Sequence, residues 1–598
     1  MRSPWLLALF AVLATLLATH APSLPGAVRG DIAYSYAFDL CEGHFVSEAA
    51  PAKREGRPSA EGCDTPYSQR MGWDGWRRAA EAWRARESTL GFLFVDLWHV
   101  ATDARALNVV DLMVFMWPAR LLFDPAAGLA ALHLGLVALA VASGVVFART
   151  LGASALAGAA AGIVVGGSGL VLESVQRGQY PQAVLAGALL FFAGLVRIVN
   201  GERHGVLLAA GGSAVAALLY WQNGLILGVG AVLFLVGSRV AGPFAAGTFR
   251  RLVAGAALAV AVCLVPAAPV IETMVKGEEM KVKVEPLGTP FPIGSTNSDD
   301  FVDLIDEVPY FILFSPAEGW IPALPLLPLA LVGFARRERV GWALLAVFGA
   351  TMALGPLPAL PDGIGGGVIP GYGAMNRTEN PAYTAVYQWV PTASRQRHPM
   401  RWATLLLVGM AAATAFGVDR ARKKWPDHTL VAVVAGAGWV AWVGPWPLRE
   451  ADFPQEVVDA LGSCEALVLP RVPGGERDLD DVHRLEGLLW VPRAPARSRG
   501  TTGVGGPTPE MRTWSKSVEE ALAARLGGAP PPAEDPLAGS CVIFEKSWFD
   551  QDGDRIRASL ARTFGDPAFT LAPTDLFMAD GTQRRVEVFL PGGTTRTW

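Results

Sequence analysis

The residues whose types could do chemistry gather at a few places in the chain. Asp31 follows the first apolar segment directly, in the pair Gly30-Asp31, and Asp39 lies eight residues further on. A carboxylate at the outer face of a membrane could act as a general base toward a hydroxyl group. A solvated loop acid, or a cap for a following helix, accounts for the same residues, and spacing alone favours that plainer interpretation.

Arginines and amides form a second group. Arg177 and Gln179 occupy a short turn between two apolar segments, and Arg395, Arg397 and Arg401 lead into another such segment. A guanidinium can bind a phosphate through two parallel hydrogen bonds, so a lipid phosphate is a natural ligand for these residues. Pairing with ordinary anionic headgroups, or with an acidic loop elsewhere in the chain, explains the arginines equally well.

Metal and nucleotide sites have little support in the sequence. The chain has no Walker loop, no zinc-ligand spacing and no Gly-x-Ser-x-Gly elbow. An acidic stretch, Asp299–Glu307, could hold a cation, but a solvated amphipathic helix face is the more common meaning of such a run. No cofactor is predicted, and a divalent metal stays an open alternative.

Composition divides the chain into an apolar part and a soluble part. Of its 598 residues, 52% are hydrophobic and 17% are charged, and the mean hydropathy is +0.33. The charge is uneven, because 40 of the 151 residues from Leu448 onward are charged, against 64 of the first 447. The net charge of −4 provides no basic field for nucleic acid, so no nucleic-acid partner is expected.

The apolar part predicts a mostly α fold, a polytopic bundle of transmembrane helices. Unpaired peptide groups are too costly in lipid for any other non-barrel solution. About eleven stretches approach the roughly 20 residues that a membrane span needs. They lie near residues 4–21, 127–147, 153–172, 180–198, 205–221, 223–238, 252–271, 320–335, 341–358, 400–418 and 429–447.

Basic residues predict the orientation of this bundle, because Lys and Arg concentrate in cytoplasmic loops. With a cytoplasmic N-terminus, every short basic loop lies inside, and an odd number of spans places the C-terminal part outside. The inside residues are then Arg149, Arg197, Arg203, Arg239, Arg250, Arg251, Arg336, Arg337, Arg339, Arg420, Arg422, Lys423 and Lys424. The chain is therefore expected in a bacterial inner membrane, with its soluble parts extracytoplasmic.

Four regions follow from this orientation. Residues 1–21 form the first helix, retained as a signal anchor rather than cleaved, and residues 22–126 form an extracytoplasmic loop with interfacial helices. One of these helices covers Val109–Phe123, for which a twelfth span is the alternative. Residues 127–447 form the bundle, and residues 448–598 form a small extracytoplasmic α/β domain with alternating strand-like and helical patterns.

Cysteine positions agree with the predicted orientation. Cys41 and Cys63 fall in the first outside loop, and Cys464 and Cys541 fall in the C-terminal domain. An oxidising compartment favours the bridges Cys41–Cys63 and Cys464–Cys541, with two reduced pairs as the alternative. The fifth cysteine, Cys263, lies inside a predicted span.

Several short motifs, taken in order, resemble those of a known superfamily. The motifs are Gly30-Asp31, Arg177-Gly178-Gln179, Ser298-Asp299-Asp300-Phe301-Val302-Asp303-Leu304, Gly319-Trp320-Ile321 and Arg397-His398-Pro399-Met400-Arg401. Their order over nearly the whole chain is similar to that in polytopic bacterial membrane proteins of the GT-C glycosyltransferase superfamily, especially YfhO-like members.

This resemblance implies transfer of a sugar from a polyprenyl-phosphate donor to an envelope glycan, lipid or protein at the outer face of the membrane. Membrane lipid and the donor are then the expected partners. By position, Asp31 would be the base and Asp39 the second choice, while Arg177, Arg397 and Arg401 would contact the donor phosphate. The first loop departs from the superfamily, because it is long and lacks the paired adjacent acids that are common there. A non-catalytic scaffold, or a protein that binds or transports a lipid-linked glycan, therefore stays the alternative.

Overall fold

The computed structural model describes a bundle of helices, two small sheets and a short hairpin. Beyond a few single residues, the described ranges are 33–38, 67–70, 125–176, 183–275, 324–355, 368–369, 373–374, 380–390, 399–443, 448–451, 466–468, 497–498, 540–545, 553–571 and 586–591.

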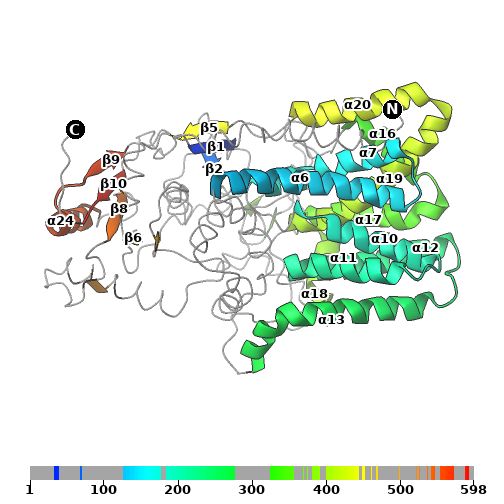
Figure 1. Ribbon diagram of the computed structural model, residues 1–598, viewed down its shortest axis with the longest axis horizontal. Coiled ribbons are helices and arrows are strands. Elements are labelled where there is room, and N and C mark those ends of the chain that lie inside the picture. Colours follow the sequence, from blue (N-terminus) through cyan, green and yellow to red (C-terminus); the bar gives the residue numbers. More distant parts are fainter. Residues whose placement is uncertain are drawn as a thin grey trace.

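The helices of the bundle run side by side and antiparallel through short turns (Figure 1). Most of their residues are Ala, Val, Leu, Gly and Ile, with charged residues confined to the ends. The helices are α6 Pro125–Thr150, α7 Ala155–Gly166, α8 Gly169–Gln176, α10 Ala186–Val199, α11 Gly205–Leu219, α12 Trp221–Ala241, α13 Thr248–Val275, α16 Leu327–Phe334, α17 Val340–Ala353, α18 Pro381–Trp389, α19 Ala403–Lys424 and α20 Pro426–Val443.

Helix α19 is the best-buried long helix of the described part, packed against α7, α16, α17 and α20. Small residues allow these close approaches. A Cβ added at Gly417 would collide with the backbone carbonyl of Leu329 in α16, and one at Gly333 would collide with that of Ala413. Because backbone atoms cannot move aside as a side chain does, the α16–α19 contact requires glycine at both positions.

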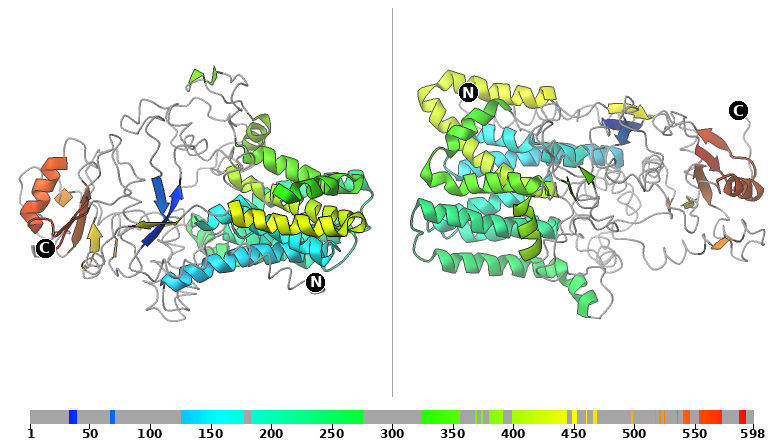
Figure 2. Two further views of the ribbon diagram at one scale, coloured as in Figure 1. Left: turned by 90° about the horizontal axis from the view of Figure 1, so that it is seen from above. Right: turned by 180° about the vertical axis from the view of Figure 1, so that it is seen from behind.

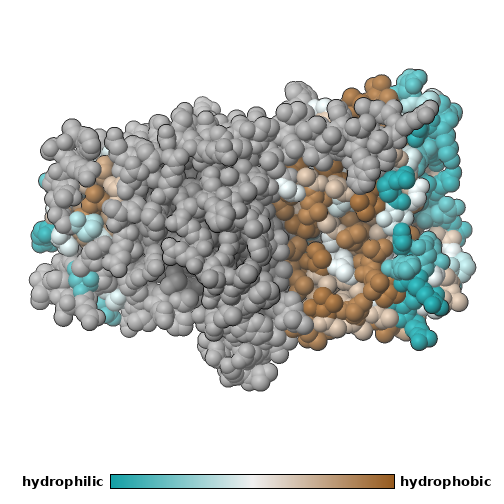
Figure 3. Space-filling model, in the orientation of Figure 1, coloured by the Kyte–Doolittle hydropathy of each residue, from teal (hydrophilic) through white to brown (hydrophobic). Residues whose placement is uncertain are grey.

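The outer surface of the bundle is apolar. Val232 of α12, Val260 of α13, Val347 of α17 and Val431 of α20 are between 59% and 66% exposed, and Figure 3 shows a hydrophobic band across the visible face of the bundle with a hydrophilic rim at one end. Soluble proteins rarely expose so much contiguous apolar surface. Among the described residues, Gln222–Ala241 and Ala403–Lys424 also have the length and hydropathy of a membrane span.

The hydrophilic rim consists of short turns rich in arginine and lysine, all at one end of the bundle (Figure 1). The backbone N–H of Ser154 donates to Asp419 Oδ2 at 2.9 Å, which joins the α6–α7 turn to the end of α19. The N–H of Ala245 donates to the carbonyl of Val199 at 3.1 Å, which joins the α12–α13 turn to the α10–α11 turn. We call this the basic end, and the other the far end.

Two sheets lie beyond the far end (Figures 1 and 2). In one, β1 (Ala33–Phe38) pairs antiparallel with β2 (Tyr67–Arg70) and with β5 (Leu448–Ala451), so the segment before the bundle is hydrogen-bonded to the segment after it. The other sheet has the order β7-β6-β8-β10-β9 and carries α24 (Gly553–Phe564). Its strands are β6 Ala466–Val468, β7 Arg497–Ser498, β8 Cys541–Glu545, β9 Phe569–Leu571 and β10 Val586–Phe589, and a separate hairpin joins β3 Val368–Ile369 to β4 Gly373–Ala374.

The predicted apolar segments from residue 127 onward appear as helices, which confirms the mostly helical fold. The first predicted span, 4–21, and the interfacial helix at Val109–Phe123 lie outside the described residues. Two boundaries differ from the prediction. The segment 153–172 is divided into α7 and α8, and only Leu327–Phe334 of the segment 320–335 is α-helical, after a 3₁₀ turn at Leu324–Leu326. The number of spans and the extent of the C-terminal domain remain predictions.

Candidate functional site

Arg401 is the one predicted site residue of the bundle that falls within the described part of the chain. It lies in the 3₁₀ helix η9 (Pro399–Trp402), which leads directly into α19. The next residue, Trp402, is buried and packs edge-on against Phe348 of α17, with ring centroids 5.7 Å apart. This contact fixes η9 on the bundle and so fixes the position from which the arginine side chain extends.

The guanidinium of Arg401 is buried and held by two residues from the α11–α12 junction. Its Nη1 donates a hydrogen bond of 2.9 Å to Oε1 of Gln222, which is itself buried. Its Cζ lies 4.0 Å from the centroid of the Tyr220 ring, within the range of a cation–π interaction. A side-chain acceptor and an aromatic face thus orient the guanidinium.

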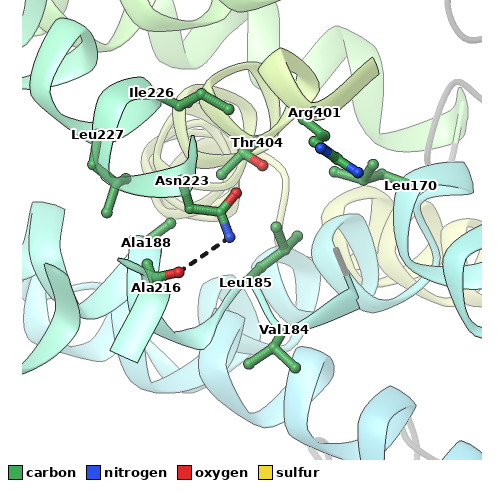
Figure 4. Close-up of a pocket in the computed structure, with 10 residues that line it drawn as sticks. All are labelled: Leu170, Val184, Leu185, Ala188, Ala216, Asn223, Ile226, Leu227, Arg401 and Thr404. Carbon is green, nitrogen blue, oxygen red and sulfur yellow. Dashed lines mark hydrogen bonds between the residues drawn. The ribbon is translucent and has the colours of Figure 1, made fainter. Parts of the chain in front are cut away.

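A small pocket adjoins this arginine (Figure 4). Its walls are mostly apolar, and its polar lining residues are Arg401, Asn223 and Thr404. The Asn223 side chain donates to the carbonyl of Ala216 at 3.3 Å, which closes the α11–α12 junction. The enclosed part has room for about one water molecule, which also suits one oxygen atom of a bound anion.

The site lies at the far end, away from the basic turns. Helix α19 begins two residues after Arg401 and ends at Lys424, so its 22 residues separate the two by about 33 Å. Tyr220 and Gln222 likewise lie at the start of α12, whose last turn carries Arg239. This separation is close to the thickness of a bilayer's hydrocarbon core, about 30 Å.

Asn380 organises a second polar point at the same end of the bundle. Its Nδ2 donates to the carbonyls of Thr351 and Gly355 at 2.7 and 2.8 Å, where α17 ends, and its Oδ1 accepts the N–H of Tyr383 at 3.3 Å. One buried side chain therefore satisfies the end of α17 and caps the start of α18. Gly355 makes this turn with a positive φ of 71°.

The other predicted site residues lie outside the described part of the chain. They are Asp31, Asp39, Arg177, Gln179, Arg395 and Arg397, together with the cysteines Cys41, Cys63 and Cys464. Their neighbours in sequence are informative. Asp31 and Asp39 flank strand β1, and Val184 and Leu185, which follow the Arg177 segment, line the pocket beside Arg401.

Cys541 is buried and is the first residue of β8, which pairs in parallel with β6. Strand β6 begins at Ala466, two residues after Cys464 in the sequence. The sheet therefore places the neighbourhood of both cysteines at the same end of adjacent strands. The bridge Cys464–Cys541 stays a prediction, as does Cys41–Cys63.

Sequence reasoning missed Tyr220, Gln222 and Asn223 as parts of the site. The signal was present, because Tyr220-Trp221-Gln222-Asn223 separates two apolar segments that are otherwise almost continuous. Adjacent amides at such a junction are costly in lipid unless they have partners. The partner of Gln222, Arg401, is 179 residues away in sequence, and only the folded bundle brings the two together.

Comparison with known proteins gives distant likenesses. No family model matches the chain, and neither does any curated protein. The arabinofuranosyltransferase AftD from Mycobacteria is 15% identical with a TM-score of 0.46, and the match covers 99% of this chain and 40% of that one. ArnT from Cupriavidus metallidurans in the apo state is 11% identical with a TM-score of 0.46, over 92% of this chain and 97% of the other.

This chain therefore spans about two fifths of the length of AftD. Neither likeness is close enough to show the family to which the chain belongs.

Proposed function

We propose that this chain is a multi-pass protein of the bacterial inner membrane that transfers a sugar from a polyprenyl-phosphate donor to an envelope glycan, lipid or protein. The reaction would take place at the far end of the bundle, on the outer face of the membrane. The observation that carries the proposal is the buried guanidinium of Arg401, oriented by Gln222 and Tyr220 about one helix length from the basic turns.

Two features support the membrane orientation. The apolar band suits lipid, and the clustering of basic turns at one end follows the usual cytoplasmic bias, so the far end faces outward. The pairing of β1 with β5 requires the segments on both sides of the bundle to share one compartment. The large hydrophilic regions would then be extracytoplasmic, where the predicted disulfides can form.

Arg401 would bind the phosphate of the donor. A guanidinium held in one orientation loses little conformational freedom when it binds a phosphate. Apolar surroundings also strengthen the attraction between the two charges, because they lower the effective dielectric constant. Arg177, Gln179, Arg395 and Arg397 are the further proposed contacts to the donor. As the bond between the anomeric carbon and the phosphate oxygen breaks, these groups would stabilise the negative charge that develops on the polyprenyl phosphate.

Asp31 would act as the base, with Asp39 as the second candidate. The carboxylate would take the proton of an acceptor hydroxyl while the hydroxyl oxygen attacks the anomeric carbon from the side opposite the phosphate. The products are the glycosylated acceptor, with inverted configuration, and free polyprenyl phosphate. No step of this scheme requires a metal ion.

The second candidate function is binding or transport of a lipid-linked glycan without catalysis. It requires only the phosphate contact at Arg401, for which the enclosed part of the pocket has room. In this case Arg401 keeps its role at the phosphate, and Asp31 and Asp39 have no chemical role.

The test uses the full chain in vesicles with labelled polyprenyl-phosphate sugar. Arg401→Gln is expected to lose both donor binding and transfer, whereas Asp31→Asn loses transfer and keeps binding. Arg250→Gln, which removes an exposed charge at the basic end, serves as the matched control and keeps both. Binding without transfer in the unmodified protein, with every donor and acceptor offered, would favour the carrier function. Normal binding and transfer by Arg401→Gln would refute the assignment of the site.

A further inference from the structure

A cluster of arginines at the basic end has no role in the proposed reaction, which takes place at the far end. Arg339, in the short helix η7 (Arg337–Arg339) between α16 and α17, is half-buried, and its Cζ lies 4.2 Å from the centroid of the Phe416 ring in α19. Its Nη1 donates a hydrogen bond of 2.7 Å to the carbonyl of Gly333, at the end of α16. Two fixed points thus hold this guanidinium at the junction of three helices.

The surroundings of Arg339 are strongly positive. Partial burial lowers the pKa of Arg339, and the neighbouring charges of Arg336 and Arg420 lower it further, while Glu338 opposes the shift. Within the described part of the chain, no carboxylate forms an ion pair with Arg339. The nearby acid Asp419 already accepts the N–H of Ser154. Three arginines therefore share this end of the bundle with two carboxylates, Glu338 and Asp419, which leaves a net positive charge that an anion would balance.

Apolar surface borders the cluster on both sides. Leu331 of α16 is 60% exposed, and on α20 Val431 and Val434 are exposed as well. Each lies only one or two helical turns from the basic end. Trp425, half-exposed at the start of the α19–α20 turn, lies at the level where amphipathic aromatic rings favour the membrane surface. Positive charge directly above exposed apolar side chains matches a molecule with an anionic head and apolar tails.

We propose that Arg336, Arg339 and Arg420 form a binding site for the headgroup phosphate of an anionic phospholipid in the leaflet at the basic end. The acyl chains would lie on the exposed faces of α16 and α20. Arg336 and Arg420 contribute most of the attraction because both are exposed, while Arg339, stacked on Phe416, provides the fixed donor. The bound lipid would hold the α16–α17 turn against the end of α19.

The test measures how many phospholipid molecules the purified full chain retains in native mass spectrometry. Phosphatidylglycerol and zwitterionic phosphatidylethanolamine are titrated separately. The double variant Arg336→Gln/Arg420→Gln is expected to lower the affinity for phosphatidylglycerol about 25-fold, or about fivefold per arginine, from roughly 1 kcal/mol for each charge near a membrane surface. The matched control, Arg239→Gln/Arg250→Gln, removes two exposed charges from another turn of the same end and is expected to retain the lipid.

Arg339→Lys provides the second test, because it keeps the charge and loses the planar fork that stacks on Phe416. A weaker preference for phosphatidylglycerol, in a variant that unfolds at the same temperature as the unmodified protein, supports the site. Equal losses in the two double variants would show only a diffuse surface attraction and overturn the proposal. Equal retention of both phospholipids would overturn it too, as would displacement of phosphatidylglycerol by millimolar inorganic phosphate.

Discussion

Replacing Gln222 by glutamate should show whether binding depends on the positive charge of Arg401, because the substitution cancels that charge and keeps the position of the guanidinium. In the structure the side-chain oxygen of Gln222 lies 2.9 Å from Nη1 of Arg401, and both residues are buried. Gln222→Glu keeps the shape and the hydrogen bond but places a carboxylate at that oxygen. The folded protein should lose little stability, since the new ion pair offsets the cost of burying a second charge. The positive charge offered to a phosphate, however, is cancelled.

The size of the effect follows from the geometry. A phosphate bound to the other side of the guanidinium would lie about 6 Å from the new carboxylate, and at an effective dielectric constant of about 20 two unit charges then repel by about 3 kcal/mol. This corresponds to roughly a 100-fold loss of affinity for polyprenyl phosphate. Gln222→Met is the matched control, because it removes the acceptor and adds no charge. It should destabilise the fold by about 1–3 kcal/mol and lower the affinity much less.

The assay titrates polyprenyl phosphate into nanodiscs that contain each variant and measures the bound fraction by native mass spectrometry. Thermal unfolding of the same samples reports stability. The two variants are expected to differ in opposite ways. Gln222→Glu keeps its stability and binds polyprenyl phosphate poorly, whereas Gln222→Met is less stable and binds it well. If the glutamate variant binds polyprenyl phosphate as tightly as the unmodified protein, Arg401 does not contact the phosphate and the proposed site is wrong.

Three further predictions concern the scaffold. Asn380→Ala should lower the free energy of unfolding by about 2–4 kcal/mol, because two buried carbonyls and one helix cap lose their partner; an unchanged unfolding temperature in detergent would contradict this role. Gly417→Ala should destabilise the α16–α19 contact strongly, whereas Gly438→Ala, which has open space around it, should be neutral or slightly stabilising, and the same thermal assay compares them. Non-reducing peptide mapping should recover the four predicted disulfide cysteines as two pairs and Cys263 as a free thiol; free thiols at all four positions would count against the predicted orientation.

Hydropathy predicted the helices well because long apolar segments leave the backbone few alternatives to a helix. Any apolar segment of sufficient length must satisfy its peptide groups internally, so the segments near 127–147, 205–221 and 223–238 became α6, α11 and α12 with ends shifted by a few residues. The concentration of Lys and Arg in loops on one side of a membrane likewise predicted that the basic residues lie in turns at one end. These features depend on local composition, which a sequence shows directly.

The break between α7 and α8 depended on a single side chain. Buried Ser168 donates from Oγ to the carbonyl of Val165 at 2.7 Å, and the same oxygen accepts the N–H of Val171 at 3.3 Å. The residue thus ends one helix and starts the next, as serine does when its hydroxyl competes with the backbone. An average over twenty apolar residues cannot detect this, although the run Gly166-Gly167-Ser168-Gly169 was a usable warning.

The site could be predicted only in part, because the partners of Arg401 are distant from it in sequence. Arg401 was identifiable as an arginine at the wrong end of a span, which is a statement about one residue and its neighbours in sequence. Its partners Gln222 and Tyr220 belong to a turn that no local pattern links to it. Long-range pairing of this kind depends on how the helices pack, and α12 contacts α19 both directly and through α17.

The contrast between the two ends of the bundle gives the strongest reason to assign a function to Arg401. Most arginines of the basic end are exposed, so their charges keep their solvation. Arg401 is only 8% exposed at the opposite end, and removing a guanidinium from water costs several kcal/mol. The Tyr220 ring returns about 2 kcal/mol and the Gln222 hydrogen bond about 1.5–3 kcal/mol, and the attraction of a bound phosphate would add to both. Replacing Arg401 by leucine removes the donor to Gln222 Oε1, so it should cost about 1–3 kcal/mol of stability while abolishing the binding of polyprenyl phosphate.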